Sequence, residues 1–326
     1  MKGEGGRVRG KRYYTFSRFL RERFGSPVYK IPLDAGFGCP NRDGTVGTGG
    51  CAFCVNRAFS PFAGQGLSIA EQIRRFKGIK GCEGRYIAYF QAYTNTYAPL
   101  ARLRRLYEEA LSDPEMVGLA VATRPDCVPD PVLDLLQGYT DRWMVWVEYG
   151  LQSCHDRTLK RINRGHDFAT FLDAVRRTRG RRIYTGAHVI IGLPGESATD
   201  ILQTAQALNA AGVDGVKLHH LQVFQGAPLA ADWAGGGIRT LTVDEYVTLA
   251  CDFIETLSPR TVILRLVGEV TDDALLLAPR WGVSKAEVIA AIDRELERRG
   301  TRQGSRLPGA TTLNTKEGED ANRAGV

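Results

Sequence analysis

Three cysteines near the beginning of the sequence have the spacing of a metal centre. Eleven residues separate Cys39 from Cys51, and two residues separate Cys51 from Cys54. Cysteine thiolates are soft ligands that suit iron–sulfur clusters and zinc. The segment that contains them, DAGFGCPNRDGTVGTGGCAFC (residues 34–54), is rich in glycine, which lets backbone N–H groups approach cluster sulfurs closely. This segment is therefore the first candidate for a metal site.

Two kinds of metal site fit this spacing. Three thiolates on a four-iron cluster leave one iron without a protein ligand, and that iron can accept the amino and carboxylate groups of a methionine moiety. An electron passed from such a cluster to a bound sulfonium gives a carbon radical that abstracts hydrogen from unactivated C–H groups. Zinc prefers four ligands in a closed structural site, and Cys82 or Cys127 could supply the fourth. The spacing alone leaves both sites open.

The elements that would position these cysteines alternate along the chain. The strand candidates are residues 28–33, 86–91, 117–123, 143–151, 183–193 and 213–224, and helix-like segments lie between them at 68–77, 100–111, 155–162, 168–179 and 199–211. Repetition of strand and helix predicts parallel strands with crossover helices. We expect an α/β fold, a partial (β/α)6 barrel of the TIM type, with the site at the carboxyl ends of its strands. A doubly wound open sheet fits the same pattern.

The sequence suggests four parts. Residues 1–25 form a basic arm and helix, and residues 26–258 form the barrel. Residues 259–300 form a small C-terminal α/β extension, in which the run TVILRLVG is a strand candidate and Ser284 with Glu287 forms a capping box before a helix. Residues 301–326 are polar and rich in Gly, Thr and Asn, so we expect them to be disordered.

Composition and charge restrict the setting of the protein. The sequence contains no run of about 18 apolar residues and no secretory signal, so we expect a cytoplasmic protein without a membrane span, in which thiols stay reduced. The net charge is +7, and residues 1–24 contribute +6 of it, from eight basic residues less two acidic ones. Such an arm can follow a phosphate backbone. The alternative is a frayed terminus that leads into a solvated helix.

Six motifs occur in order beyond the arm. They are DAGFGCPNRDGTVGTGGCAFC, QAYTNTYA, ATRPDCV, GLQSCHDRTLKRINRGHD, GLPGE and LLLAPRW, at residues 34–54, 91–98, 122–128, 150–167, 192–196 and 275–281. With these motifs the chain resembles the radical S-adenosylmethionine (SAM) superfamily, in the branch related to the Elongator catalytic subunit and the oxygen-independent coproporphyrinogen oxidases. Within that branch it most resembles a family of uncharacterised bacterial radical SAM proteins.

The resemblance implies roles for individual residues. Cys39, Cys51 and Cys54 would ligate a [4Fe–4S] cluster, to which SAM binds. The cofactor-binding residues that the resemblance implies are Phe53, Gln91, Tyr93, Asn95, Gln152, Arg164, His188 and Gly192. An arginine such as Arg164 suits the cofactor carboxylate because a guanidinium makes charge-assisted, often bidentate contacts. The segment QAYTN stands where relatives have glycine-rich sequences, and His188 stands where the coproporphyrinogen oxidases have an acid.

The residues that would contact the substrate are less well defined. The catalytic candidates are His219, His220, Cys154 and Tyr93. Each of these side chains also suits a packing role, because histidine, cysteine and tyrosine are often buried in the walls of α/β proteins.

These patterns predict an enzyme that cleaves SAM to a 5′-deoxyadenosyl radical and abstracts hydrogen from its substrate. The Elongator resemblance and the basic arm make RNA the first macromolecular substrate to consider, and a small metabolite is equally open. Such an enzyme needs an electron donor, for example a flavodoxin or a ferredoxin. The competing hypothesis is a non-catalytic protein in which cysteine-bound zinc or an iron–sulfur cluster supports a nucleic-acid-binding surface.

Overall fold

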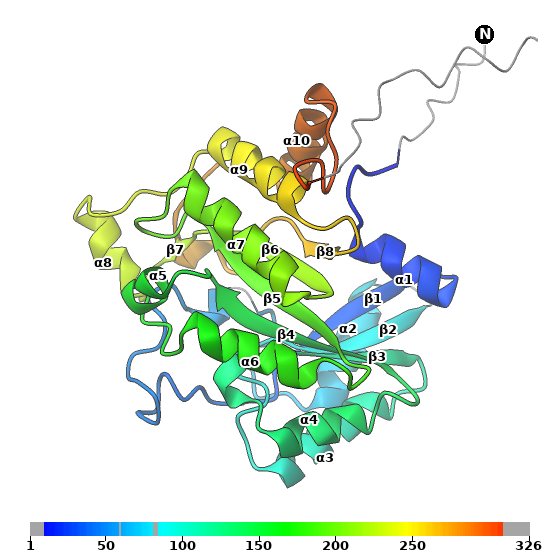
Figure 1. Ribbon diagram of the computed structural model, residues 1–326. Coiled ribbons are helices and arrows are strands. Elements are labelled where there is room, and N and C mark those ends of the chain that lie inside the picture. The colour runs from blue at the N-terminus through cyan, green and yellow to red at the C-terminus, as the bar shows by residue number, and fades with distance from the viewer. Residues whose placement is uncertain (1–9, 59, 81–83, 309–326) are drawn as a thin grey trace, which may run out of the picture.

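The computed structural model describes residues 10–58, 60–80 and 84–308. Seven strands form one sheet in the order β1–β2–β3–β4–β5–β6–β8, and each neighbouring pair is parallel. The sheet curves into a half-barrel (Figure 1). Its strands are β1 (Val28–Leu33), β2 (Arg85–Phe90), β3 (Met116–Thr123), β4 (Met144–Gln152), β5 (Tyr184–Ile191), β6 (Gly215–His220) and β8 (Val262–Arg265).

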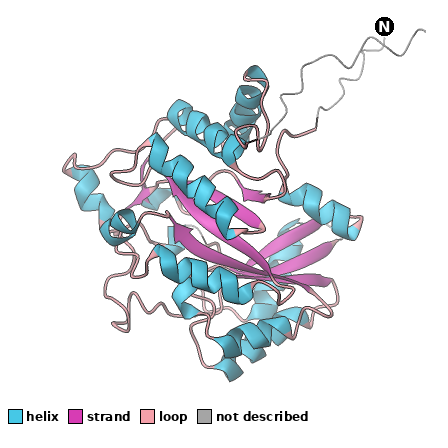
Figure 2. Ribbon diagram, viewed as in Figure 1, coloured by secondary structure: helices cyan, strands magenta, loops and turns pink. Residues whose placement is uncertain are grey.

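Helices lie on the outer, convex side of this sheet (Figure 2). The crossover helices are α2 (Ile69–Lys80), α3 (Leu100–Leu111), α4 (Asp130–Gln137), α5 (Asp156–Arg161), α6 (Phe168–Thr178), α7 (Ala198–Ala211) and α9 (Val243–Thr256). The remaining elements are α1 (Phe16–Phe24), η1 (Asn56–Ala58), η2 (Pro125–Cys127), β7 (Val223–Phe224), α8 (Leu229–Ala234), η3 (Asp273–Leu275), β9 (Leu276–Ala278) and α10 (Lys285–Arg298).

The predicted barrel is confirmed, with one strand more than expected. The order of the strands follows the chain without a reversal, which excludes the doubly wound alternative. The run TVILRLVG, assigned above to the extension, contains β8, which pairs with β6 at Gly215↔Val262. The helix α4 was not predicted, because it is only eight residues long and contains a proline in its first turn, so the periodic pattern is short.

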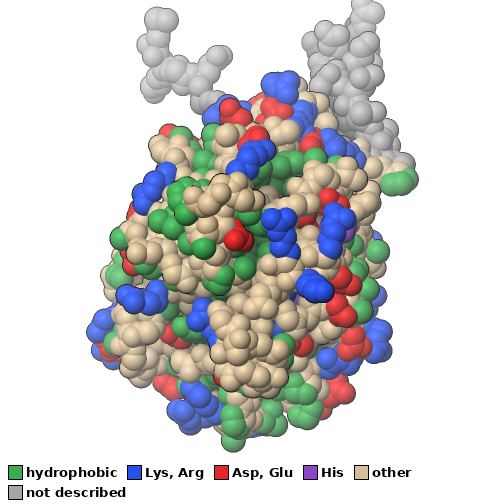
Figure 3. All heavy atoms as spheres, turned by 90° about the vertical axis from the view of Figure 1, so that its left-hand side faces the viewer, with side chains coloured by type: hydrophobic (Ala, Val, Ile, Leu, Met, Phe, Trp, Pro, Cys, Tyr) green, Lys and Arg blue, Asp and Glu red, His purple; other side chains and the backbone are tan. Residues whose placement is uncertain are grey.

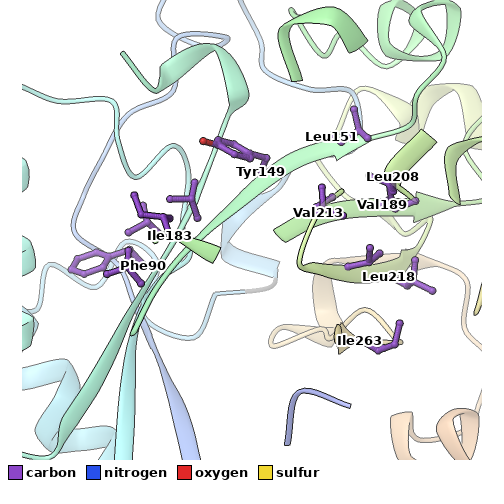
Figure 4. Close-up of a cluster of buried hydrophobic side chains, with 14 of the residues drawn as sticks. Phe90, Tyr149, Leu151, Ile183, Val189, Leu208, Val213, Leu218 and Ile263 are labelled. Atoms are coloured by element: carbon purple, nitrogen blue, oxygen red, sulfur yellow. The ribbon is translucent and has the colours of Figure 1, made fainter. Parts of the chain in front are cut away.

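Successive side chains along each strand point to opposite faces of the sheet, so the interior has two parts: the core under the helices and the concave side of the barrel. Outward side chains pack against the helices in the main core, where Tyr149, Val189 and Leu218 extend from β4, β5 and β6 (Figure 4). All nine residues of β4 are buried, as expected for a strand that is covered on both faces. Inward side chains line the concave face, on which the polar residues discussed below lie.

Helix α1 closes the concave face at the amino ends of the strands. Leu20 is buried there among Ile87, Ala120 and Trp146. The ring of Phe19 lies edge-on to that of Trp146, with centroids 5.6 Å apart. The Thr15 side chain caps the start of the helix by accepting the Arg18 N–H, and the left-handed residue Gly25 ends it.

Two of the predicted segments differ from expectation. The helix expected within residues 1–25 is present as α1, but it is not the solvated helix of the alternative hypothesis, because its apolar side covers the barrel; residues 1–9 lie outside the described part of the chain. Residues 301–308 are not disordered, since Gln303 is buried and its amide bonds the backbone of Tyr14, Ser258 and Thr261. Residues 309–326 lie outside the described part.

No helix in the described ranges is long and apolar enough to cross a membrane.

The packing of α1 leads to a stability prediction. Leu20→Ala should lower the free energy of unfolding by about 2–5 kcal/mol, because it leaves a cavity between α1 and the sheet. Urea denaturation followed by circular dichroism would measure the change. Arg21→Ala, on the exposed side of the same helix, is the matched control and should change stability by no more than about 0.5 kcal/mol. Equal stability of the two variants would contradict the role of α1 as a cover.

Candidate active site

The three cysteines lie in the long connection that follows β1, at the carboxyl ends of the strands. This end is on the left in Figure 1, opposite α1. Cys39, Cys51 and Cys54 line one cavity, and its lining reaches from this connection down into the concave side of the barrel. Cys51 is buried, and Cys39 and Cys54 are partly exposed. The structure therefore brings the three thiols together where the strand pattern placed the site.

Two glycines allow the cysteine segment to fold tightly. A side chain at Gly47 would approach the Asn41 Oδ1 to 2.5 Å, and one at Gly50 would approach the Arg42 Nε to 2.8 Å. Gly50 also has a φ of 82°, which is unfavourable for other residues. Asn41 is fully buried by this packing, and its Nδ2 donates to the carbonyl of Asn163 at 2.6 Å.

Nitrogen donors approach two of the three sulfurs. The Asn41 Nδ2 lies 3.6 Å and the Arg164 Nη1 3.3 Å from the Sγ of Cys51. The Asn56 Nδ2 lies 3.5 Å from the Sγ of Cys54. Burial of the thiol, followed by the proximity of Cys51, raises the pKa of Cys54 to about 12. Thiolates at these positions would thus need a positively charged group, such as iron, to be stable.

The cavity contains most of the candidate residues. Those that line it are Cys39, Cys51, Phe53, Cys54, Gln91, Tyr93, Gln152, Arg164, His188, His219 and His220. Backbone geometry is unusual at two of them, because Tyr93 has a φ of 63° and Gln152 a φ of 81°. Non-glycine residues with such values are uncommon and cluster at functional sites.

Three candidates do not line this cavity. The Asn95 side chain turns back to donate to the carbonyl of Ala122 at 2.7 Å and thereby ties the connection after β2 to strand β3. The backbone of Gly192 lies beneath Leu241, which a side chain at Gly192 would meet at 2.9 Å. Cys154 lies beyond the end of β4 and accepts from the Thr204 hydroxyl at 3.4 Å on the helix side of the sheet. Its proposed catalytic role is therefore withdrawn.

Gln152 and Arg164 converge over Gly150. A side chain at Gly150 would lie 2.6 Å from the Arg164 Nη2 and 2.9 Å from the Gln152 Nε2, so the two polar side chains could keep their present positions only with glycine there. Arg164 donates to the Gly150 carbonyl through Nε at 3.0 Å and Nη2 at 2.5 Å. A β-bulge between Gly150 and Gln152 re-aims the end of β4, as bulges next to active sites commonly do.

The concave side of the barrel also holds a charged network that the sequence patterns did not predict. At its centre is Glu148 of β4, which is completely buried. Its carboxylate accepts from the Tyr89 hydroxyl at 3.0 Å, from the Lys217 Nζ at 3.3 Å and from Lys30. Its Oε2 also lies 2.7 Å from the Nε2 of His188. The sequence did contain a signal for this network. Glu148 in VWVEYGL and Lys217 in VKLHH are charged residues within apolar strands, and a buried charge needs a partner.

The network shifts the pKa values of its members. Burial alone would raise the pKa of Glu148, but the positive charges of Lys217 and Lys30 outweigh burial and hold it well below its usual value. Burial lowers the pKa of Lys217 to about 7, although Glu148 opposes this shift. Burial and the charge of Lys217 lower the pKa of His188 to about 4, so His188 is neutral near pH 7.

The C-terminal part of the chain supplies one wall of the cavity. Arg265 at the end of β8 and Glu269 both line it, and they form an ion pair of 3.3 Å. His220 of β6 packs against Trp281, with ring centroids 4.1 Å apart. Burial lowers the pKa of His220 to about 4, and its buried Nδ1 has no partner among the described residues. His220 is thus a neutral wall residue that belongs to the cavity.

A site for a single ion such as zinc is not preformed among the described residues. Within residues 10–58, 60–80 and 84–308, no three or more Cys, His, Asp or Glu side chains are arranged to hold a single metal ion. The thiol of Cys127 does not line the cavity and points to the Asp126 carboxylate at 3.8 Å. Cys82 lies outside the described residues.

Comparison with known proteins agrees with this geometry. Residues 36–208 match the radical SAM superfamily, and residues 213–298 match the radical SAM C-terminal domain. The chain belongs to the radical SAM superfamily. Membership implies a [4Fe–4S] cluster and SAM, and it identifies the protein as an enzyme of this class. The second match coincides with the segment that adds β8 and the wall containing Arg265.

The chain has relatives of similar length in Bacillus subtilis and Escherichia coli. The chain is 43% identical to Bacillus subtilis YtqA over 300 residues, which cover 90% of this chain and 92% of that protein. It is 43% identical to Escherichia coli YhcC over 293 residues, which cover 90% of this chain and 94% of that protein. These relatives confirm the resemblance to a bacterial radical SAM family.

The fold is also similar to a solved Elongator structure. The Elp3 protein of the archaeon Methanocaldococcus infernus aligns with a TM-score of 0.63 at 16% identity. The alignment covers 85% of this chain but only 64% of the archaeal chain. At this identity the likeness shows the fold, which in both proteins is that of the radical SAM half-barrel.

The lowered pKa of Lys217 predicts a pH-dependent stability. A lysine in the unfolded chain titrates near 10.4, so between about pH 7 and pH 10 the unfolded state binds more protons than the folded state. The free energy of unfolding should therefore rise with pH over this range. Denaturation at several pH values should show a smaller rise for Lys217→Met than for the unmodified protein. Lys285→Met, which removes a partly exposed lysine, is the control, and an identical slope in all three proteins would contradict the assignment.

Proposed function

We propose that Cys39, Cys51 and Cys54 hold a [4Fe–4S] cluster and that the adjoining cavity binds SAM. The observation that carries this proposal is the convergence of the three thiols on one cavity, together with nitrogen donors aimed at the sulfurs of Cys51 and Cys54. Such donors are typical of iron–sulfur sites, whose sulfurs carry negative charge. The residues present therefore fit the group that the family implies.

The protein's own residues would bind and orient the cofactor. When bound, the cluster and SAM supply a 5′-deoxyadenosyl radical that can abstract hydrogen from an unactivated C–H group. Arg164 places a buried positive charge beside Cys51, where it suits a carboxylate. Gln152, Gln91 and Phe53 line the same cavity and offer polar and aromatic contacts. Helix α1 keeps water from the opposite end of the barrel.

His188 fits the expected role in cofactor binding poorly. Its Nε2 is already bonded to Glu148, so one ring nitrogen remains for any ligand. We assign His188 to the floor of the cavity, where it helps to hold Glu148. The electron for SAM cleavage would come from an external reductant, and a flavodoxin or a ferredoxin has the required chemistry.

RNA is the weaker of the two substrate hypotheses. Helix α1, whose last turn contains Arg21 and Arg23, lies at the amino ends of the strands, opposite the cysteine segment (Figure 1). Figure 3 views the carboxyl-end face, on which Lys and Arg side chains are interspersed with Asp and Glu instead of forming one basic surface. A small-molecule substrate that enters the cavity accounts for this distribution better than an extended polyanion does.

The cysteine assignment is tested by single substitutions. Cys39→Ala, Cys51→Ala and Cys54→Ala should each abolish the brown colour and iron content of anaerobically purified protein, and with them the slow reductive cleavage of SAM to 5′-deoxyadenosine. Cys251→Ala, which removes a buried thiol of α9 far from the cavity, should keep about four irons per chain. Full iron content in any of the first three variants would refute the assignment.

The donors to the sulfurs predict an effect on reduction potential. Hydrogen bonds to cluster sulfurs favour the more negative, reduced state, so Asn41→Ala should shift the potential of the cluster to a more negative value. Redox titration monitored by electron paramagnetic resonance measures this shift without any substrate. Asn209→Ala removes a comparable amide that donates to the Thr256 carbonyl at 2.8 Å. Equal potentials for the two variants would show that the Asn41 contact does not act on the cluster.

A further inference from the structure

We infer that the floor of the barrel is a binding site for the anionic group of a small substrate, a carboxylate or a phosphate ester, and that Lys217, Arg265 and His219 bind this group. The inference rests on the proposed function, because it takes the cavity beneath the cysteines as the active site. It adds a substrate class and three residues to that proposal.

The central observation is a pair of cations on neighbouring strands. Lys217 of β6 and Arg265 of β8 are register partners in the sheet, and both line the cavity. Like charges placed opposite each other on adjacent strands repel. After burial, the charge of Arg265 is one of the causes that lower the pKa of Lys217. A bound anion between the two side chains would remove this repulsion.

The carboxylates around the floor do not fully balance these cations. Glu148 is shared between Lys30 and Lys217. Glu269 is half-exposed and is shared between Arg265 at 3.3 Å and Lys285 at 3.1 Å. Among the described residues at the floor, the three cations Lys30, Lys217 and Arg265 therefore face two carboxylates. A bound anion would therefore meet an excess of positive charge here, and it would favour the protonated form of Lys217.

Hydrogen-bond donors remain for a ligand. The Lys217 ammonium has three N–H groups, of which Tyr89 at 2.5 Å and Glu148 at 3.3 Å take two. Arg265, as far as the described residues show, is paired with Glu269 alone. His219 lies two residues after Lys217, so both point to the concave side. Its ring lies 5.8 Å from that of His188, and no hydrogen bond joins its nitrogens to the described residues.

The cavity is closed at its floor, so only a small chemical group of a substrate can reach Lys217. The same cavity has the cysteines at one end and Lys217 at the other. Beneath Lys217, Phe16 of α1 and Trp146 close the barrel, with ring centroids 5.7 Å apart. A substrate whose acidic group reaches the floor would therefore present its carbon atoms between the floor and the cofactor, where hydrogen abstraction must occur.

The test uses small fluorinated probes and ¹⁹F NMR on the anaerobically purified, full-length protein. Fluoroacetate represents a carboxylate, monofluorophosphate represents a phosphate, and fluoroacetamide is the neutral analogue of fluoroacetate. We expect saturable line broadening with at least one of the two anions and none with the amide. The anion that binds at lower concentration identifies the acidic group of the substrate.

Variants then locate the site. Arg265→Gln and His219→Gln should each weaken binding of the anion by roughly tenfold or more, the effect of losing a charged hydrogen bond. Arg260→Gln, which alters an exposed arginine just before β8, should bind as the unmodified protein does. Lys217→Met should also lose binding, but it can fail to fold because Glu148 loses a partner, so the conclusion depends on the first two variants.

The outcomes separate this inference from the proposed function. Equal broadening by fluoroacetamide, no broadening by either anion, or unchanged anion binding in Arg265→Gln and His219→Gln would overturn the anion site. None of these results affects iron content or SAM cleavage, which test the cysteine assignment independently. Anion binding in a protein without iron would support the site while refuting the proposed function.

Discussion

The interior of this half-barrel depends on one buried carboxylate, that of Glu148. Removing a charge from water is costly unless partners replace the lost hydration. Glu148 receives these partners from four other strands, through Lys30, Tyr89, His188 and Lys217. The network therefore fixes how far these strands are curved toward one another, and it separates the apolar layer over α1 from the open cavity beneath the cysteines.

Much of the architecture could be predicted from the sequence, because the strands and helices are indicated by patterns within short segments. The run of buried apolar residues in β4 identifies a strand that is covered on both faces, and the alternation with helices predicts parallel pairing. The cysteine segment was also predictable, since a parallel strand places the residues that follow it at the carboxyl edge. The positions of Gln152 and Arg164 beside this segment followed from the family resemblance, and the structure accounts for their convergence by the absence of a side chain at Gly150.

The features that could not be predicted depend on contacts between distant residues. The pairing of Glu148 with Lys30 and Lys217 requires the register of β1, β4 and β6, which no local pattern contains. Cys154 was placed in the site because of its neighbour Gln152, but the chain turns outward after Gln152 and directs the thiol to Thr204. The basic composition of residues 10–25 likewise concealed the apolar side of α1, because hydrophobic side chains at helical spacing are interrupted there by arginines.

The edge of β8 has a consequence for how the chain is made. A half-barrel leaves its last strand exposed, and exposed edges are sites of association with other chains. Here the Ile263 N–H donates to the Tyr14 carbonyl at 2.7 Å, and Gln303 bonds to both Arg12 and Tyr14. The segment that covers the edge thus leaves the ribosome long before the strand that it covers. During synthesis the segment around Tyr14 therefore has no partner at first. An emerging chain would expose this segment, and later the edge of β8, to chaperones until residue 303 has been added.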